Sequence, residues 1–179
     1  MPIVATLHRD GGARFVSLLN RMGASRDTLS DTLSNLIENG LVMKSPGEGL
    51  LMRPEYVLTS AGEAVGDACL FAAREMTRLG LVDMALKKWP PLVVVAMGRG
   101  ASRFGEIKEA LPGITPRALT GALRELQEAG LVKRSVTESW PPGTSYTLTE
   151  RAREALPAID GVCIACEQLE AGETEPAPS

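Results

Sequence analysis

Histidine and cysteine, on which many catalytic and metal sites depend, are scarce in this chain. His8 is the one histidine among 179 residues, so histidine-based metal sites and serine–histidine triads have almost nothing to be built from. Three cysteines are an odd number without the spacing of a disulfide framework, which is typical of a reducing compartment. Glycine-rich phosphate loops, paired carboxylates and nucleophile elbows are absent from the sequence. We therefore expect neither enzyme activity nor a cofactor.

Long apolar segments are also missing. The longest apolar run, 92–97, is far shorter than the roughly 20 residues that a transmembrane helix needs. The first residues, MPIVATLHRDGG, lack the basic start, apolar stretch and cleavage site of a signal peptide. With 44% hydrophobic and 23% charged residues, the composition is that of a soluble globular protein. We expect a cytoplasmic chain that makes no membrane contact.

A large excess of positive charge, which would indicate a protein that coats nucleic acid, is absent, because the net charge is −3. Its distribution is uneven. Residues 1–78 carry 8 Lys and Arg against 9 Asp and Glu, residues 79–165 carry 11 against 9, and residues 166–179 carry 0 against 4. The negative total therefore comes largely from the last residues, and the middle of the chain is mildly basic.

The sequence repeats itself at a distance of about 90 residues. With a shift of 90, segment 25–59 aligns with 115–149, and with a shift of 89, segment 3–22 aligns with 92–111. The matches are Arg14-Phe15 with Arg103-Phe104, Leu29, Leu33 and Leu36 with Leu119, Leu123 and Leu126, Gly40-Leu41-Val42 with Gly130-Leu131-Val132, and Tyr56, Leu58 and Thr59 with Tyr146, Leu148 and Thr149. A shared leucine stripe does not explain all of these in one register. We infer a tandem duplication.

The second copy shows most clearly what each copy is. Its leucines recur at helical spacing, Thr115 is a suitable N-cap, Pro116 suits the first helical position, and Gly130 suits the stop. These signals predict a helix over 116–129. In the first copy, Ser25 and Gly40 take the roles of cap and stop.

The neighbouring segments complete the pattern. A shorter helix ends at Pro112-Gly113, strands are expected over 131–136 and 145–148, and a helix over 150–165 follows. Two helices joined by a short turn and followed by a two-stranded hairpin form a winged helix. The predicted fold class is mainly α with small β-hairpins (α+β), as two tandem winged helix-turn-helix domains. The expected domains are 1–78, truncated at its N-terminal helix, and 79–165, followed by a disordered acidic tail over 166–179.

The second copy resembles the HxlR-type winged-helix transcription regulators of bacteria, relatives of the MarR group. The residues that carry the resemblance are Trp89, Arg103-Phe104, Leu111-Pro112-Gly113-Ile114-Thr115, Leu119, Leu123, the run from Leu126 through Gly130-Leu131-Val132, Arg134, Pro141-Pro142 and Tyr146 to Thr149. The resemblance covers about residues 81–160, and the first copy is similar more weakly. It implies a DNA-binding regulator that normally acts as a dimer of single-winged-helix subunits.

The chain departs from that family pattern in three ways. It carries two winged helices, so one chain could mimic a dimer. It has no cysteine near the start of the domain, where many members sense oxidants. Gly143 stands where a basic residue often follows the double proline of the wing.

A helix in the major groove presents the face opposite its core stripe, which identifies candidate DNA-binding residues. On the helix of the second copy these are Thr115, Arg117, Thr120, Gly121 and Arg124. Lys133 and Arg134, with Thr137 and Ser139, could reach phosphates from the hairpin, and Arg103 from the preceding helix. The alternative is that they are solvated surface side chains, with Arg103 in an internal ion pair.

The same face of the first copy is less suited to phosphate. Its candidates are Arg26, Ser30, Ser34 and the wing residue Arg53. Asp27 and Asp31 lie among them, and like charges repel. Three interpretations stay open: these aspartates read cytosine amino groups, this copy binds weakly, or it has become an interaction module. With so few basic residues, we expect a shallow dependence of DNA affinity on salt.

Cys163 and Cys166 form a C-x-x-C pair on the last predicted helix. One pair supplies two of the four ligands that a structural zinc site needs. We favour two small residues in the core or in a dimer helix, and a zinc site shared between chains or a redox pair stays an alternative.

The leading hypothesis is a transcriptional regulator that reads duplex DNA mainly through the helix over 116–129. Segments 60–78 and 150–165 would then pack between the copies or form a homodimer. A small-molecule effector is a further partner that the hypothesis leaves open. The rival hypothesis is a protein–protein interaction module built from winged helices, with DNA binding lost in the first copy.

Overall fold

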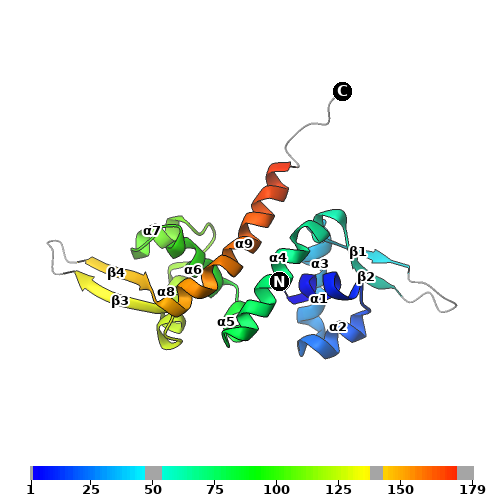
Figure 1. Cartoon of the computed structure of the whole chain (residues 1–179), viewed down its shortest axis with the longest axis horizontal. Coiled ribbons are helices and arrows are strands. Elements are labelled where there is room, and N and C mark those ends of the chain that lie inside the picture. The colour runs from blue at the N-terminus through cyan, green and yellow to red at the C-terminus, as the bar shows by residue number, and fades with distance from the viewer. Residues whose placement is uncertain (1, 47–53, 138–142, 173–179) are drawn as a thin grey trace, which may run out of the picture. The chain divides into compact units, whose positions relative to one another are not determined.

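The chain forms two compact units, seen in a computed structural model that describes residues 2–46, 54–137 and 143–172 (Figure 1). The first unit groups residues 1–74 with 161–179, and the second comprises residues 75–160. Both contain helices and one two-stranded antiparallel sheet. The predicted fold class, mainly α with small β-hairpins, is confirmed.

The same order of elements occurs twice. The first series is α1 (Pro2–Asp10), α2 (Phe15–Met22), α3 (Arg26–Glu38), β1 (Val42–Ser45), β2 (Glu55–Leu58) and α4 (Ser60–Arg78). The second is α6 (Trp89–Gly98), α7 (Phe104–Glu109), α8 (Pro116–Glu128), β3 (Val132–Thr137), β4 (Gly143–Leu148) and α9 (Glu150–Gly172). The short α5 (Val82–Ala85) precedes α6. The predicted helix-turn-helix and hairpin are therefore present in both copies.

Local signals determine where the third helix of each series begins and ends. The hydroxyl of Thr115 accepts from the backbone N–H of Ala118 at 3.2 Å, and the hydroxyl of Ser25 caps α3 in the same way. At the other end, Gly130 has a φ of 69°, which an L side chain rarely adopts. The N–H of Leu131 then bonds the carbonyl of Leu126 at 2.8 Å, as in a Schellman motif.

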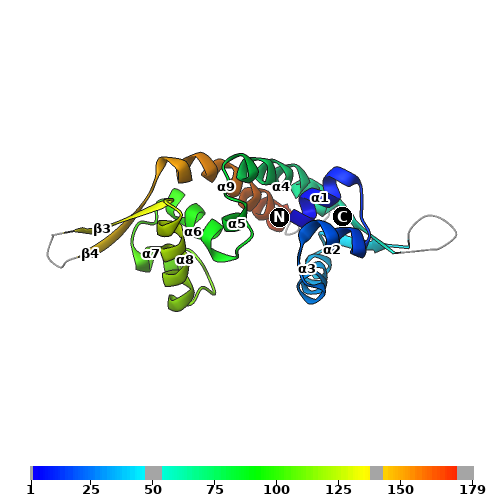
Figure 2. The ribbon, with the colours of Figure 1, turned by 90° about the horizontal axis from the view of Figure 1, so that it is seen from below.

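The leucine stripe forms the core, as its spacing predicts. In the second unit α8 buries Leu119, Leu123 and Leu126, and it packs beside α6 (Figure 2). In the first unit Leu29 and Leu33 of α3 are buried with residues of α1, α2 and β1. The opposite face of each helix is consequently left to solvent.

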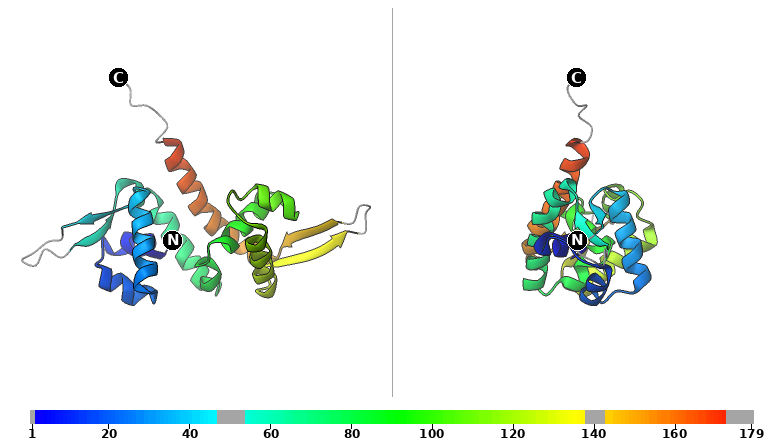
Figure 3. Two further views of the ribbon diagram at one scale, coloured as in Figure 1. Left: turned by 180° about the vertical axis from the view of Figure 1, so that it is seen from behind. Right: turned by 90° about the vertical axis from the view of Figure 1, so that its right-hand side faces the viewer.

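Each hairpin is tied to the end of its helix by a threonine. In the second unit Val132 pairs with Leu148 at the base of the hairpin, and Thr149 donates its hydroxyl hydrogen to the carbonyl of Gly130 at 2.9 Å. Thr59 donates to Gly40 at the equivalent place in the first unit. Within each unit the strands run out from the helices (Figure 3). This bond holds the base of the wing beside the C-terminus of the helix.

The prediction for the end of the chain was wrong in one respect. Helix α9 continues to Gly172, so residues 166–172 are helical rather than part of an acidic tail. In the first unit Cys166 and Leu169 line a surface hollow with residues of α3, including Leu36. No helix among the described residues is long and apolar enough to cross a bilayer.

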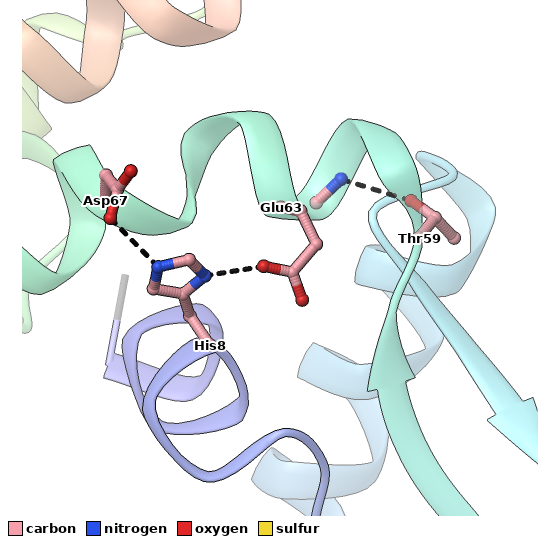
Figure 4. Close-up of polar contacts among 5 residues, drawn as sticks. His8, Thr59, Glu63 and Asp67 are labelled. Carbon is pink, nitrogen blue, oxygen red and sulfur yellow. Dashed lines mark hydrogen bonds and ion pairs between the residues drawn. The ribbon is translucent and has the colours of Figure 1, made fainter.

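The single histidine joins α1 to α4 in the first unit (Figure 4). His8 Nδ1 lies 2.6 Å from Glu63 Oε2, and its Nε2 lies 3.0 Å from Asp67 Oδ1. A Cβ on Gly66 would lie 2.4 Å from the ring, so glycine makes room for it. Hydrogen bonds to Glu63 first, and then to Asp67, raise the pKa of His8 above its ordinary value of 6.5.

This arrangement predicts a pH-dependent stability of the first unit. The protonated histidine is favoured by folding, so its contribution is complete below pH 6.5, the unfolded value, and is lost as the pH rises through the higher folded pKa. His8→Met, which introduces the residue that aligns in the second copy, should flatten this dependence. Urea unfolding below and above pH 6.5 measures it. Equal slopes for wild type and variant would contradict the prediction.

Candidate nucleic-acid interface

The outward face of α8 presents an arginine in its first turn and another in its middle. Arg117, Thr120, Gly121 and Arg124 are all exposed, and nothing lies within 4 Å of a Cβ built on Gly121. The hydroxyl of Thr120 donates to the carbonyl of Pro116 at 2.8 Å, and that of Thr115 is occupied as the N-cap. The face therefore has small side chains at its centre, at Thr120 and Gly121, and positive charges on either side, at Arg117 and Arg124.

The two arginines of this face differ in their partners. Arg124 Nε donates to Glu128 Oε1 at 2.8 Å, one turn further along α8. Within the described ranges Arg117 makes no ion pair with a carboxylate. An exposed pair such as Arg124–Glu128 is worth at most about 1 kcal/mol, so Arg124 can exchange Glu128 for a phosphate.

The hairpin adds two exposed cations beside the helix. Lys133 and Arg134 lie on β3, and a terminal nitrogen of Arg134 lies 3.4 Å from the hydroxyl of Thr144 on β4. The predicted wing residues Arg53 and Ser139 lie outside the described residues, as does the side chain of Thr137. Of the predicted wing cations, Lys133 and Arg134 are therefore exposed, and as neighbours on one strand they point to opposite faces of the hairpin.

Arg103 stands at the N-cap of α7, where its backbone is held firmly. The carboxylate of Glu106 accepts from the backbone N–H of Ser102 at 2.8 Å and from that of Arg103 at 3.0 Å. These bonds lower the pKa of Glu106 below its ordinary value. The alternative for Arg103, an internal ion pair, is not found among the residues that the structure describes. Its guanidinium is exposed, and its charge contributes to the lowered pKa of Glu106.

The corresponding face of the first unit is acidic and polar. Arg26, Ser30 and Ser34 are exposed on α3, as predicted, but Asp27 occupies the place of Arg117 and Asp31 that of Gly121. Arg124 aligns with Ser34. This face therefore carries two arginines on α8, but one arginine and two aspartates on α3.

Three other arginines of the first unit are paired with carboxylates. Arg14 Nε donates to Glu55 Oε1 at 3.1 Å, and Arg9 and Arg21 both contact Asp10. Arg14–Glu55 joins residues 41 positions apart, which no local pattern indicates.

The cysteines do not form a metal centre in the described ranges, where no cluster of three or more His, Cys, Asp or Glu side chains could hold an ion. Cys69 is buried, Cys163 and Cys166 are half-buried, and none is in a disulfide. Burial raises the pKa of Cys69 and Cys166, which disfavours the reactive thiolate.

Comparison with known proteins identifies the same architecture twice. The model of the HxlR-like helix-turn-helix family matches residues 1–76 and again residues 84–171. An uncharacterized HTH-type transcriptional regulator of Methanothermobacter thermautotrophicus is 42% identical over 76 residues, which are 42% of this chain and 58% of that protein. One from Synechocystis is 34% identical over 108 residues, 60% of this chain and 80% of that protein.

A solved structure is also similar. The reduced form of the transcriptional regulator YodB from B. subtilis is 28% identical, with a TM-score of 0.41, and the match covers 55% of this chain and 93% of that one. The curated relatives are named as transcriptional regulators, which agrees with the prediction of a regulator rather than an enzyme. Because the family matches each copy separately, the predicted duplication is confirmed as well.

Proposed function

Because the chain belongs to the HxlR-like helix-turn-helix family, we propose that it is a DNA-binding transcriptional regulator whose second unit makes the main contact with duplex DNA. Helix α8 would enter the major groove with Arg117 and Arg124 toward base edges or phosphates. Lys133, Arg134 and Arg103 would contact the backbone on either side. Thr120 and Gly121 leave room for close approach.

One observation carries the choice of the second unit. The exposed face of α8 bears two arginines, whereas the aligned face of α3 bears two aspartates. Phosphate repels an acidic face and attracts a cationic one, and most of the affinity for DNA is electrostatic. Ion pairs of Arg9, Arg14 and Arg21 reduce the positive potential of the first unit further.

Substitution of the arginines on α8 tests the assignment. Arg117→Ala with Arg124→Ala should weaken binding of the full chain to its selected genomic DNA at least about tenfold, since one bidentate contact is worth roughly 1–3 kcal/mol. Arg26→Ala, which removes an exposed arginine at the start of α3, is the matched control and should bind almost as the wild type does. Fluorescence anisotropy measures both.

The outcomes separate the proposal from its rival. If Arg117→Ala with Arg124→Ala weakens DNA binding and Arg26→Ala does not, the second unit makes the main contact. The reverse result would reject the proposal. If the wild-type chain selects no DNA, the interaction module is favoured instead, with the exposed Asp27 and Asp31 as its contact residues. Homodimerisation and the binding of a small-molecule effector are compatible with both functions, and both stay predictions.

A further inference from the structure

The two units differ at one position beside the wing, where the first has a carboxylate and the second a hydroxyl. Glu55 in β2 aligns with Ser145 in β4, and Arg14 aligns with Arg103. In the first unit Glu55 accepts a hydrogen bond from Arg14 Nε at 3.1 Å. In the second unit the wing supplies no carboxylate here, and the acidic group near Arg103 is Glu106 of α7, which accepts from the Arg103 backbone N–H at 3.0 Å.

The backbone around this position is similar in the two units, although the N–H of Ala13 bonds the Tyr56 carbonyl at 2.9 Å, whereas that of Ser102 bonds the Glu106 carboxylate. The N–H of Tyr56 bonds the carbonyl of Ala13 at 2.8 Å, and the N–H of Tyr146 bonds that of Ser102 at 2.7 Å. The two arginines are the N-caps of α2 and α7, both with a ψ of 153°. In each unit the second strand of the wing therefore passes the arginine at the N-cap of the preceding helix. Glu55 lies beside Arg14 in the first unit, and Ser145 lies beside Arg103 in the second.

The side chain at this position changes the local charge. Ser145 is neutral, and its hydroxyl lies 2.8 Å from that of Ser135 across the hairpin. The wing therefore adds no carboxylate beside Arg103, and the Glu106 carboxylate near it accepts from the backbone N–H groups of Ser102 and Arg103. Arg14 with Glu55 forms a pair without net charge. A phosphate that approaches Arg14 also approaches the Glu55 carboxylate, and binding there releases no net counterion.

We propose that the residue at this wing position determines whether the arginine that begins the preceding helix contacts a DNA phosphate. Ser145 permits the contact in the second unit, and Glu55 opposes it in the first. This inference rests on the proposed function of the chain. An exposed ion pair adds little stability, so Glu55 acts through its charge and not by fixing Arg14 in place.

Substitutions in the second unit test the proposal directly, with the full chain and a labelled duplex of random sequence as the probe. Ser145→Glu should lower the affinity about tenfold in 0.05 M salt and reduce the slope of log K against log salt by about 0.9, the value of one phosphate contact. Ser145→Gln introduces a side chain of the same size as glutamate but without its charge, and this variant should bind DNA as the wild type does. Circular dichroism confirms that both variants fold.

A double-mutant cycle identifies Arg103 as the group through which the charge acts. In the Arg103→Ala background, Ser145→Glu should lower the affinity much less than in the wild type, since no phosphate contact remains to be lost. An equal loss in both backgrounds would overturn the proposal, because the carboxylate would then repel DNA without involving Arg103.

The reverse change tests the first unit. Glu55→Ser and Glu55→Gln should both free Arg14, raise the affinity and steepen the salt slope by about 0.9. No gain in either variant would overturn the part of the proposal that concerns Glu55.

If Arg117→Ala with Arg124→Ala weakens binding but Ser145→Glu does not, this inference fails and the proposed function stands. A wild-type chain that binds no DNA overturns both.

Discussion

Leu126→Ala is expected to lower the free energy of unfolding of the second unit by about 2–5 kcal/mol, the range for a large-to-small change in a packed core. Leu126 is 0% exposed on the buried side of α8. It also supplies the carbonyl that closes the C-terminus of the helix. The substitution therefore leaves a cavity beneath the face that would contact DNA.

The duplication offers a matched control at the same helical position. Leu36 aligns with Leu126, but it is only half-buried and lines a surface hollow in the first unit. Leu36→Ala creates less of a cavity, since solvent already reaches the site, and should cost clearly less than Leu126→Ala.

Tryptophan fluorescence separates the two units in this experiment. The first unit, residues 1–74 and 161–179, contains no tryptophan, and Trp89 lies in α6 of the second. A fluorescence transition therefore reports the second unit, whereas circular dichroism follows both. Leu126→Ala should shift the fluorescence transition in urea, and Leu36→Ala should shift mainly the dichroism. Equal costs for the two substitutions would contradict the burial on which the prediction depends.

Features encoded by short stretches of sequence were predictable. The caps Ser25 and Thr115, the glycine stops and the leucine stripe act within one or two helical turns, so pattern alone located α3 and α8 to within one residue. Repetition strengthened the inference, because two copies in one register cannot arise from composition. These signals also identified which face of α8 is exposed.

Features made by distant residues were not predictable. The contacts of His8 with Glu63 and Asp67 span 55 and 59 positions, and Arg14–Glu55 spans 41. Arg124–Glu128 is different, because an i,i+4 pair on a helix can be identified from sequence, and that signal was overlooked. It matters for function, because it leaves Arg117 as the one arginine of the predicted α8 face without a carboxylate partner among the described residues.

Exchange of the α8 face for that of α3 is expected to have the largest effect on DNA binding. Arg117→Asp with Arg124→Ser copies the residues at positions 27 and 34 onto the second unit. Two contacts worth roughly 1–3 kcal/mol each are lost, and a carboxylate is added that repels phosphate, so affinity should fall at least about 100-fold. Binding is measured by anisotropy as a function of salt.

Helix electrostatics make this exchange a clean test of function. Arg117 lies in the first turn of α8, where the helix dipole disfavours positive charge, and Asp27 lies in the first turn of α3, where the dipole favours negative charge. Arg117→Asp should therefore stabilise the second unit by about 0.3–1 kcal/mol while it weakens DNA binding. Stability is measured on Arg117→Asp alone, because Arg124→Ser also removes the Arg124–Glu128 pair. Opposite signs for stability and affinity in that variant cannot come from misfolding. The helix dipole favours an aspartate at position 117, so a DNA contact would explain why the residue there is an arginine. Unchanged affinity in the exchanged variant would show that α8 is not part of the interface.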